Sequence, residues 1–350
     1  MRAISFAIIA ILLFGNITDS IASSQKSFTG TLIDAHSQVR CDQTAENAEE
    51  IINRVDIDFM LLAPGGCHKN EKYFGDMTSH QGALAKVAAS NKKIFYLAGM
   101  KKLSSTNKNY VSKWKLKTLN PALDIGKLAN ASYVGASEVI IQHAISKKDY
   151  GINPGTQLGL LDKQLEKVIE QFKERRFPIV LHIELKDSED KAKQTLADLD
   201  ALLAKHKNYP FVLNHVGQAS PDVVADWLTK HKNLHFLLGQ TSGRFQIGTR
   251  KQKSEAQNGW VSFFDVEGLS KKEHEKNPKW NDVWLNLVLA NPEKFVMGYD
   301  LVFARNWESK LTQDVTIWRS ALGQIDQEKA SLIACGNAKR LWKLPIECKK

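Results

Sequence analysis

The stretch "TLIDAHSQVR", Thr31 to Arg40, starts as an apolar strand and then places a carboxylate, an imidazole and an amide at every second position. Side chains alternate between the two faces of a strand, so this spacing predicts that Asp34, His36 and Gln38 point the same way. A strand presents three polar groups to one face only where that face is wet or where the groups bind something. The stretch is therefore both the first predicted strand and part of a candidate site.

Further apolar or β-branched runs follow, with amphipathic helical segments between them. The predicted strands lie at about 29–36, 57–62, 93–98, 137–142, 178–185, 210–216, 234–240 and 294–300. Alternating strands and helices predict right-handed crossovers and a parallel sheet. Eight strands favour an α/β fold of the closed (β/α)8 type, the TIM barrel, over an open sheet.

Two connections are longer than a crossover requires: Met100–Lys117 after strand three and Thr241–Asn281 after strand seven. Long connections in a compact domain are commonly functional lids or mobile inserts. The chain has no internal repeat, low-complexity segment or linker composition. We therefore expect residues 23–350 to form a single domain.

The first residues have the pattern of an export signal. Arg2 precedes an apolar run from Ala3 to Phe14, and "SIA", Ser20 to Ala22, fits a small-residue cleavage site. The run is shorter than the ~20 apolar residues that span a membrane. We expect residues 1–22 to be a signal peptide and the protein to be periplasmic or secreted without stable membrane insertion; the alternative is an uncleaved N-terminal anchor.

The formal net charge is +10, from 48 Lys and Arg against 38 Asp and Glu. The basic residues are scattered as pairs, whereas nucleic-acid-binding proteins gather them on one stripe with stacking aromatic residues. We therefore expect no nucleic-acid partner. The charge slightly favours an anionic small-molecule substrate, because net charge steers ligands. Oligomeric state is left open.

Four cysteines in an exported chain favour disulfides over thiol catalysis. Four cysteines allow three pairings. Cys41 and Cys67 each follow a predicted strand, and Cys335 and Cys348 both lie in the C-terminal tail. We prefer these two pairs.

Polar side chains recur at the carboxyl ends of the predicted strands, where TIM barrels carry their chemistry. Besides strand one, "FPIVLHIELKD" supplies His182 and Glu184, "PFVLNHVGQ" supplies His215, and "KFVMGYDLVF" supplies Asp300. Each residue alone is more typical of a structural hydrogen bond or a turn. Three imidazoles and a carboxylate at one barrel mouth, however, match the donors of a divalent metal.

A bound metal lowers the pKa of its water from about 16 to about 7 and polarises a neighbouring carbonyl, so hydrolysis or metal-assisted decarboxylation would follow. Asp300 is the expected general base, with Glu184 in reserve. Arg244 and His143 are candidates for substrate binding. Trp260 and Trp280 suit a packed loop interior as well as a substrate-stacking face. Serine-hydrolase chemistry is disfavoured, because the chain has no Gly-x-Ser-x-Gly elbow.

These motifs resemble the amidohydrolase superfamily, most closely its amidohydrolase-related branch, which includes decarboxylases as well as hydrolases. The matching stretches are "DAHSQ", "VLHIE", "VLNHVG", "GYDL" and the tail "CGNAKRLWKL". The resemblance covers almost the whole mature chain. It implies a TIM barrel that binds metal through a strand-one Asp-x-His-x-His, histidines ending strands five and six, and an aspartate ending strand eight.

Two departures from the family pattern bear on the metal. Gln38 stands where the family has its second strand-one histidine, and an amide oxygen is a poorer zinc donor than imidazole. Glu184 is placed to supply the missing ligand. The end of strand four, Ile141 to His143, has no bridging Lys or Glu, and Glu138 falls too early in the predicted strand. We therefore expect one ion.

The sequence thus predicts an exported metal-dependent hydrolase acting on a small carboxylester, lactone or amide. One divalent ion, zinc by preference, would be held by His36, His182, His215 and Asp300, completed by Gln38 or Glu184. His215 or another imidazole facing the metal would polarise the carbonyl. The alternatives are a decarboxylase on the same scaffold and a catalytically silent ligand-binding barrel, which the loss of a histidine at Gln38 favours.

Overall fold

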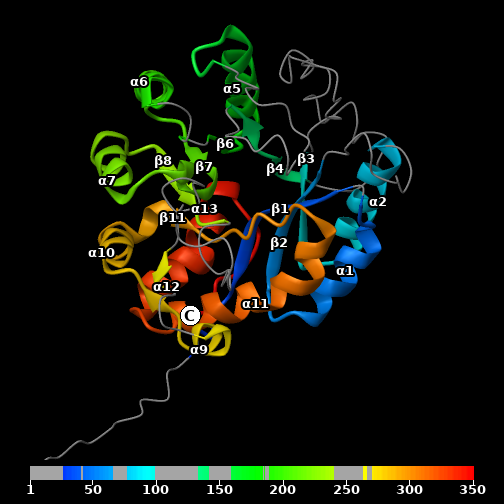
Figure 1. The fold of residues 1–350 in the computed structure, drawn as a ribbon. Coiled ribbons are helices and arrows are strands. Elements are labelled where there is room, and N and C mark those ends of the chain that lie inside the picture. The colour runs from blue at the N-terminus through cyan, green and yellow to red at the C-terminus, as the bar shows by residue number, and fades with distance from the viewer. Residues whose placement is uncertain are drawn as a thin grey trace, which may run out of the picture.

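The computed structural model describes most of the chain from residue 27 onward (Figure 1). The described residues are 27–40, 42–65, 77–98, 133–141, 159–183, 185, 189–239, 263–265 and 270–350. The predicted signal peptide and the predicted connection Met100–Lys117 lie outside these ranges.

Parallel strands occupy the centre of the molecule in two sheets, ordered β1-β2-β3-β4 and β11-β8-β7-β6-β5. Their bounds are β1 Ile33–Val39, β2 Phe59–Pro64, β3 Ile94–Ala98, β4 Tyr133–Ala136, β5 Val139–Ile140, β6 Ile179–His182, β7 Phe211–Leu213, β8 Leu234–Leu237 and β11 Phe295–Val296. Each strand pairs in parallel with its neighbours in these sheets, as βαβ crossovers require.

The two sheets join into one barrel. Only Ser137 and Glu138 separate β4, which pairs with β3, from β5, which pairs with β6. On the other side, the N–H of Ala35 in β1 donates to the carbonyl of Met297 at 3.0 Å, and the N–H of Asp300 donates to the carbonyl of His36 at 2.9 Å. The predicted (β/α)8 order is therefore confirmed, with its fourth strand in two pieces.

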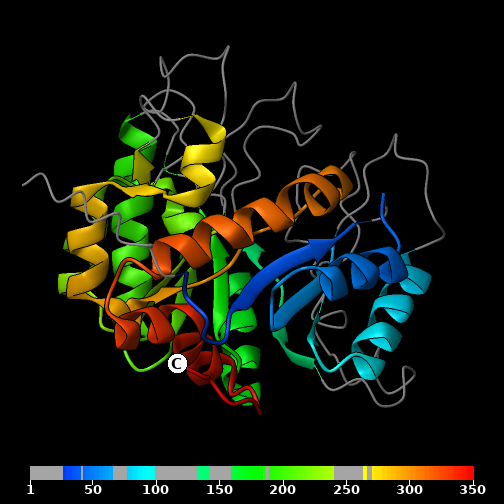
Figure 2. The same cartoon turned by 90° about the horizontal axis from the view of Figure 1, so that it is seen from below.

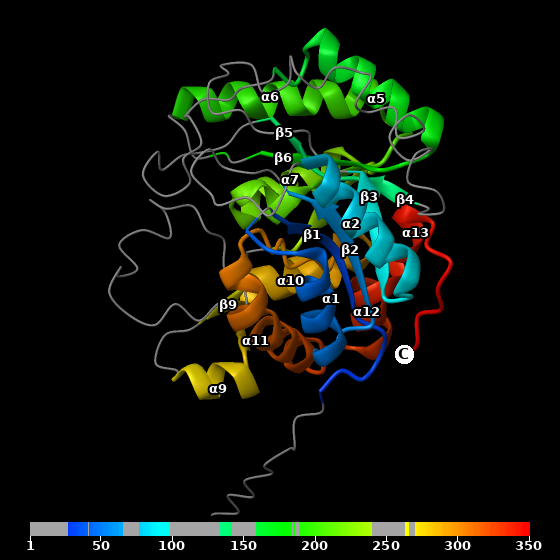
Figure 3. The ribbon, with the colours of Figure 1, turned by 90° about the vertical axis from the view of Figure 1, so that its right-hand side faces the viewer.

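Helices surround the strands, most of them on the outside of the barrel (Figures 1 and 3). Their bounds are α1 Ala45–Arg54, α2 Met77–Ser90, α5 Lys163–Arg175, α6 Glu189–Lys205, α7 Pro221–Lys230, α9 Lys271–Lys276, α10 Asp282–Ala290, α11 Ala304–Leu322, α12 Gln327–Ser331 and α13 Asn337–Trp342. Short helical turns are η1 Asn214–Gln218, η2 Pro292–Lys294 and η3 Leu332–Gly336. No helix within the described ranges is long and apolar enough to cross a membrane.

Local sequence explains how these helices begin and which face they bury. At α1, the hydroxyl of Thr44 accepts the N–H of Asn47 at 3.1 Å, and Ile51 and Ile52 face the core. The long helix α11 lies beside β1 and α1 (Figure 2). Its Arg319 guanidinium donates to the carbonyl of Phe28 at 2.9 Å, which ties the helix to the segment before β1.

The amino end of the barrel is filled by apolar side chains and closed by the C-terminal tail. The inward-facing residues form one buried cluster: Ile33, Ala35, Leu61, Ala63, Leu97, Val180, Val212, Leu237 and Val296. Leu341 and Trp342 of α13 pack against it, and a disulfide joins Cys335 to Cys348. This confirms the predicted tail pairing; the predicted Cys41–Cys67 pair lies outside the described residues.

Part of the predicted long connection Thr241–Asn281 is structured. Strands β9 Phe264–Asp265 and β10 Lys279–Trp280 form an antiparallel pair. The Trp280 ring is buried against those of Phe264 and Trp318, and its indole N–H donates to the carbonyl of Ala321 at 3.1 Å. Of the two interpretations of Trp280, the packed interior is therefore the one observed.

Candidate metal centre

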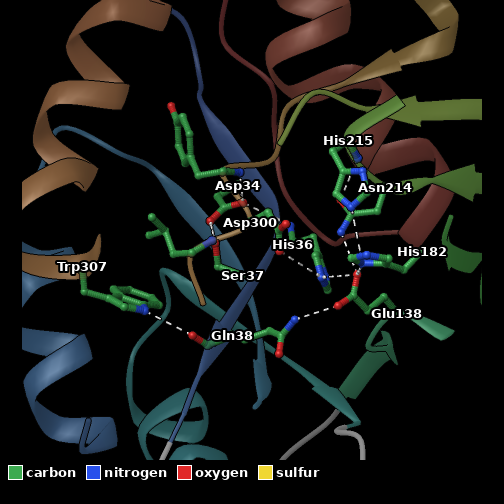
Figure 4. Close-up of polar contacts among 12 residues, drawn as sticks. Asp34, His36, Ser37, Gln38, Glu138, His182, Asn214, His215, Asp300 and Trp307 are labelled. Atoms are coloured by element: carbon green, nitrogen blue, oxygen red, sulfur yellow. Dashed lines mark hydrogen bonds and ion pairs between the residues drawn. The ribbon is translucent and has the colours of Figure 1, made fainter. Parts of the chain in front are cut away.

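Strand β1 brings His36 and Gln38 to the carboxyl ends of the strands through an irregularity. Its register against β2 shifts between Asp34 and Ser37. The Asp34 carboxylate accepts the backbone N–H groups of His36 at 3.1 Å and Tyr299 at 2.9 Å, and the hydroxyl of Ser37. Asp34 therefore links β1 to the segment after β11. Its carboxylate is separate from the cluster that contains the His36 imidazole (Figure 4). The prediction that strict alternation sets all three polar groups on one face was wrong.

Glu138 lies at the centre of the polar cluster, although the sequence argument placed it too early in its strand. The strand predicted at 137–142 actually starts at Tyr133, so Glu138 lies just after the carboxyl end of β4, with only Ser137 between them. Its Oε1 accepts the amide N–H of Gln38 at 3.0 Å, and its Oε2 accepts the Nδ1–H of His182 at 2.9 Å. Excluding Glu138 was wrong, and the β-forming run "YVGA" before it was the available signal.

The end of β7 supplies two more side chains. The Asn214 amide donates to Glu138 Oε2 at 2.7 Å and its carbonyl accepts the backbone N–H of His215 at 2.9 Å. Nε2 of His215 lies 3.3 Å from Nδ1 of His182, and the two rings meet edge to face with centroids 4.4 Å apart. His215 thus reaches the cluster through His182 (Figure 4). Asn214 was not predicted; its place beside a strand-end histidine was the only signal.

The backbone is held in the left-handed region at both ends of the cluster. His215 and Val216 have φ of 37° and 47°, and Asp300 has φ of 48°. A β-branched residue avoids this region strongly. Strained positions of this kind cost about 1–3 kcal/mol each and persist where the surroundings determine them. A Cβ on Gly239 would lie 2.8 Å from Cβ of Asp300, so a glycine is needed there.

Burial and charge together set the protonation of the cluster. Burial lowers the pKa of His36, but the carboxylates of Glu138, Asp300 and Asp34 outweigh it, and the pKa is raised. Burial raises the pKa of Glu138, but the imidazoles of His182 and His36 outweigh it and hold that pKa well below its usual range. Burial raises the pKa of Asp34, although hydrogen bonds from Ser37 and two backbone N–H groups oppose the shift. Glu138 is therefore an anion facing imidazoles.

The residues present fit a divalent cation. Ligand atoms of His36, Glu138 and Asp300 all lie within 4.8 Å of one another, and all three residues are buried. His36 Nε2 is 3.7 Å from Glu138 Oε2 and 3.8 Å from Asp300 Oδ1. These distances are too long for hydrogen bonds, yet one zinc ion with bonds of about 2.1 Å contacts atoms up to about 4.2 Å apart.

His36 gives independent support for a ligand. Within the described ranges, neither of its ring nitrogens has a hydrogen-bond partner, although the side chain is buried. Buried polar atoms are nearly always hydrogen-bonded, and exceptions mark functional atoms or missing ions.

The other predicted site residues divide into two groups. Gln38 contacts the cluster through its amide nitrogen, which has no lone pair for a cation. In this arrangement it donates a hydrogen bond to Glu138. Glu184, Arg244, His143 and Trp260 lie outside the described residues.

A second group of ligand-type side chains lies on the outer helices. Glu166, Glu170 and His206 approach one another within 4.8 Å. Two lysine side chains already provide positive charge there. The Lys173 ammonium lies 2.8 Å from His206 Nδ1, and the Lys205 ammonium lies 2.8 Å from Glu166. This group is a salt-bridge network between α5 and α6.

No protein-family model matches the chain, and no curated protein is significantly similar to it in sequence. Among solved structures, an uncharacterized TIM-barrel protein from Bordetella bronchiseptica has a TM-score of 0.50 and 11% identity, over 89% of this chain and 98% of that one. An amidohydrolase from Burkholderia multivorans with bound zinc has a TM-score of 0.47 and 13% identity, over 90% and 100% of the two chains. A 4-oxalomesaconate hydratase from Rhodopseudomonas palustris has a TM-score of 0.48 and 13% identity, over 89% and 96%.

The likeness to the Bordetella protein agrees with the strand order and with the hydrogen bonds that join the two sheets. The chain has a TIM-barrel fold, with a buried cluster of carboxylates and imidazoles at the carboxyl ends of its strands.

Proposed function

We propose that this protein is an exported metal-dependent hydrolase that cleaves a small carboxylester, lactone or amide with the help of one divalent ion, zinc by preference. The observation that carries the proposal is His36. It is a buried imidazole without a hydrogen-bond partner in the described part of the chain, between the carboxylates of Glu138 and Asp300. Burying such a group is costly unless a ligand satisfies it.

The residues that would hold the ion are His36, Glu138 and Asp300, with His182 beside Glu138. When bound, a divalent ion lowers the pKa of a water and polarises a carbonyl oxygen. Asp300 takes up the proton of the attacking water at its carboxylate, since a general base must be within hydrogen-bond reach of that proton. We assign His215 to polarise the scissile carbonyl. Gln38 keeps a supporting role, and one ion remains the expectation.

The finer parts of the proposal rest on the sequence. The reserve role for Glu184 follows from its place at the end of predicted strand five. The substrate contacts by Arg244 and His143 follow from their places after predicted strands seven and four. An anionic substrate follows from the positive net charge. Export to the periplasm or medium follows from residues 1–22.

Two other functions would use the same side chains. A decarboxylase needs the same ligands and would release CO2 from a carboxylate substrate. A silent ligand-binding barrel would keep His36, protonated, as the partner of Glu138 and Asp300. The raised pKa of His36 is the specific observation in its favour, because a proton can then serve where the ion otherwise would.

Metal content and turnover on the purified protein test the proposal together. We expect about one equivalent of zinc, manganese or iron per chain by elemental analysis. Hydrolysis of at least one member of a panel of carboxylesters, lactones and amides should disappear on chelation and return with metal. The Asp300→Asn variant is the matched control for background hydrolysis.

Each other outcome has a definite meaning. CO2 release from a carboxylate panel without hydrolysis would replace the hydrolase by the decarboxylase. Absence of bound metal together with chelator-insensitive or absent turnover would overturn the proposal.

A further inference from the structure

Two side-chain amides from different strands converge on the Glu138 carboxylate. The Gln38 Nε2–H, from β1, donates to Oε1 at 3.0 Å, and the Asn214 Nδ2–H, from the turn after β7, donates to Oε2 at 2.7 Å. Both side chains are buried, and the Glu138 side chain lies between them (Figure 4). One amide therefore binds each carboxylate oxygen, and the two come from strands that are not neighbours in the barrel.

This arrangement fixes which oxygen faces the imidazoles. Gln38 engages Oε1, while Oε2 lies 2.9 Å from His182 Nδ1 and 3.7 Å from His36 Nε2. Hydrogen bonds to a charged acceptor are about twice as strong as those between neutral groups. Two neutral donors also orient a carboxylate without adding a positive charge that would compete with a cation.

Asn214 has a second contact that makes its position specific. Its Oδ1 accepts the backbone N–H of His215, where the chain enters the left-handed turn. One side chain thus links the orientation of Glu138 to the placement of His215.

We propose that Gln38 and Asn214 are positioning residues that orient the Glu138 carboxylate, with Oε2 facing His36 and His182, as an oxygen ligand of the metal. This inference rests on the proposed function, because it assigns the two amides to the same ion. Gln38 thereby has a definite role as a donor.

Zinc affinity measures the positioning role. The nearly isosteric variants Gln38→Met and Asn214→Leu remove the donors without changing charge. Loss of a hydrogen-bond partner of a ligand typically weakens metal affinity 10–100-fold, and we expect that range for each variant, measured by competition with a chromophoric chelator. The visible spectrum of Co²⁺-substituted protein should change with it.

The matched control is Gln194→Met. Gln194 also donates its amide to a carboxylate, Asp198, at 2.8 Å, but on the exposed surface of α6. Its variant should bind zinc and Co²⁺ as the wild type does.

A comparison in metal-free protein tests the contact itself and covers the case in which Gln38→Met fails to fold. Gln38→Glu sets two carboxylates against each other, so it should lower the urea midpoint. Adding Glu138→Gln restores a donor–acceptor pair of reversed polarity and should raise the midpoint of Gln38→Glu while not raising that of the wild type. If Glu138→Gln shifted the urea midpoint equally in the wild type and in Gln38→Glu, that result would overturn the contact between the two side chains.

The outcomes separate the two proposals. Zinc bound by the wild type, with Gln38→Met and Asn214→Leu within threefold of it, would overturn the positioning role and leave the proposed function standing. A wild type that binds no zinc, manganese or iron would overturn the proposed function and with it the positioning role, even if the metal-free comparison supports the contact.

Discussion

The two ends of the barrel bury different kinds of side chain. At the carboxyl end, buried carboxylates and imidazoles face one another, and His215 and Asp300 have strained backbones. At the amino end, apolar side chains pack against Trp342 and a disulfide closes the tail. There the buried amide of Asn337 donates to the carbonyls of Pro292 and Phe295, both at 2.8 Å.

The contrast indicates where stability and function are located. Buried clusters of ionisable side chains are costly, and folded proteins keep them where a ligand or a reaction uses them. Apolar burial and satisfied hydrogen bonds stabilise wherever they occur. We therefore expect changes at the carboxyl end to affect chemistry and changes at the amino end to affect the free energy of unfolding. Four variants test this division.

The largest effect is expected at the carboxyl end. Asp300→Asn removes the general base, which typically contributes 10²–10⁴-fold to rate, so kcat should fall by about that factor. The melting temperature should stay near that of the wild type, because the backbone and most of the side-chain volume remain. Steady-state kinetics and thermal melting on the same sample measure both. A variant that keeps its rate would remove Asp300 from the chemistry.

At the amino end, Trp342→Ala should lower stability without affecting metal binding. The side chain is 3% exposed, and truncating a buried aromatic residue costs about 3–5 kcal/mol. We expect that loss in urea unfolding, with zinc affinity unchanged under native conditions. Weakened zinc binding in the folded variant would show that the two ends are coupled and would break the comparison.

Removing the disulfide should lower the free energy of unfolding slightly less than Trp342→Ala does. Cys335 and Cys348 are 13 residues apart, and closing a loop of about this size stabilises by about 3 kcal/mol. Cys348→Ser should lower the unfolding free energy accordingly, with wild type in the same non-reducing buffer as reference. An unchanged unfolding free energy would mean that apolar packing alone holds the tail.

The smallest effect is a pH dependence at His235, near α13. Burial, reinforced by Lys294 and Arg340, lowers the pKa of His235 to about 3. The unfolded chain therefore binds this proton below its ordinary pKa of about 6.5 while the folded chain does not, and stability falls as pH decreases from there towards 3. At about 1.4 kcal/mol per pH unit, the contribution between pH 7 and pH 5 is about 2 kcal/mol.

His235→Gln should remove this part of the pH dependence, measured as the difference in unfolding free energy between pH 7 and pH 5. An equal difference in variant and wild type would assign the dependence to other groups, including those of the metal centre.

Much of the fold could be predicted from the sequence, because the pattern that encodes it is local. Apolar runs such as the one that became β6 alternate with helical segments such as the one that became α5, and parallel strands so connected form a barrel in few ways. The predicted bounds of short strands were the least accurate: β11 covers only Phe295–Val296 of a run predicted at 294–300.

Part of the candidate site could also be predicted from the sequence. His36, His182, His215 and Asp300 stand at strand ends, and the parallel strands of a barrel all end at the same face. Their order along the chain was enough to place them near one another, although the contacts that connect them were not predicted.

The sequence alone determined the order of the barrel and the residue types at its mouth, because strand and helix periodicity are properties of neighbouring residues. Only the tertiary structure decided that Glu138 joins the cluster, that Asp34 leaves its face and that Gln38 and Asn214 bind the same carboxylate. A register shift in β1 and an interruption between β4 and β5 produce these results. Both depend on hydrogen bonds to strands distant in sequence. The local run "YVGA" indicates a strand before Glu138, but it does not show which side chains Glu138 contacts.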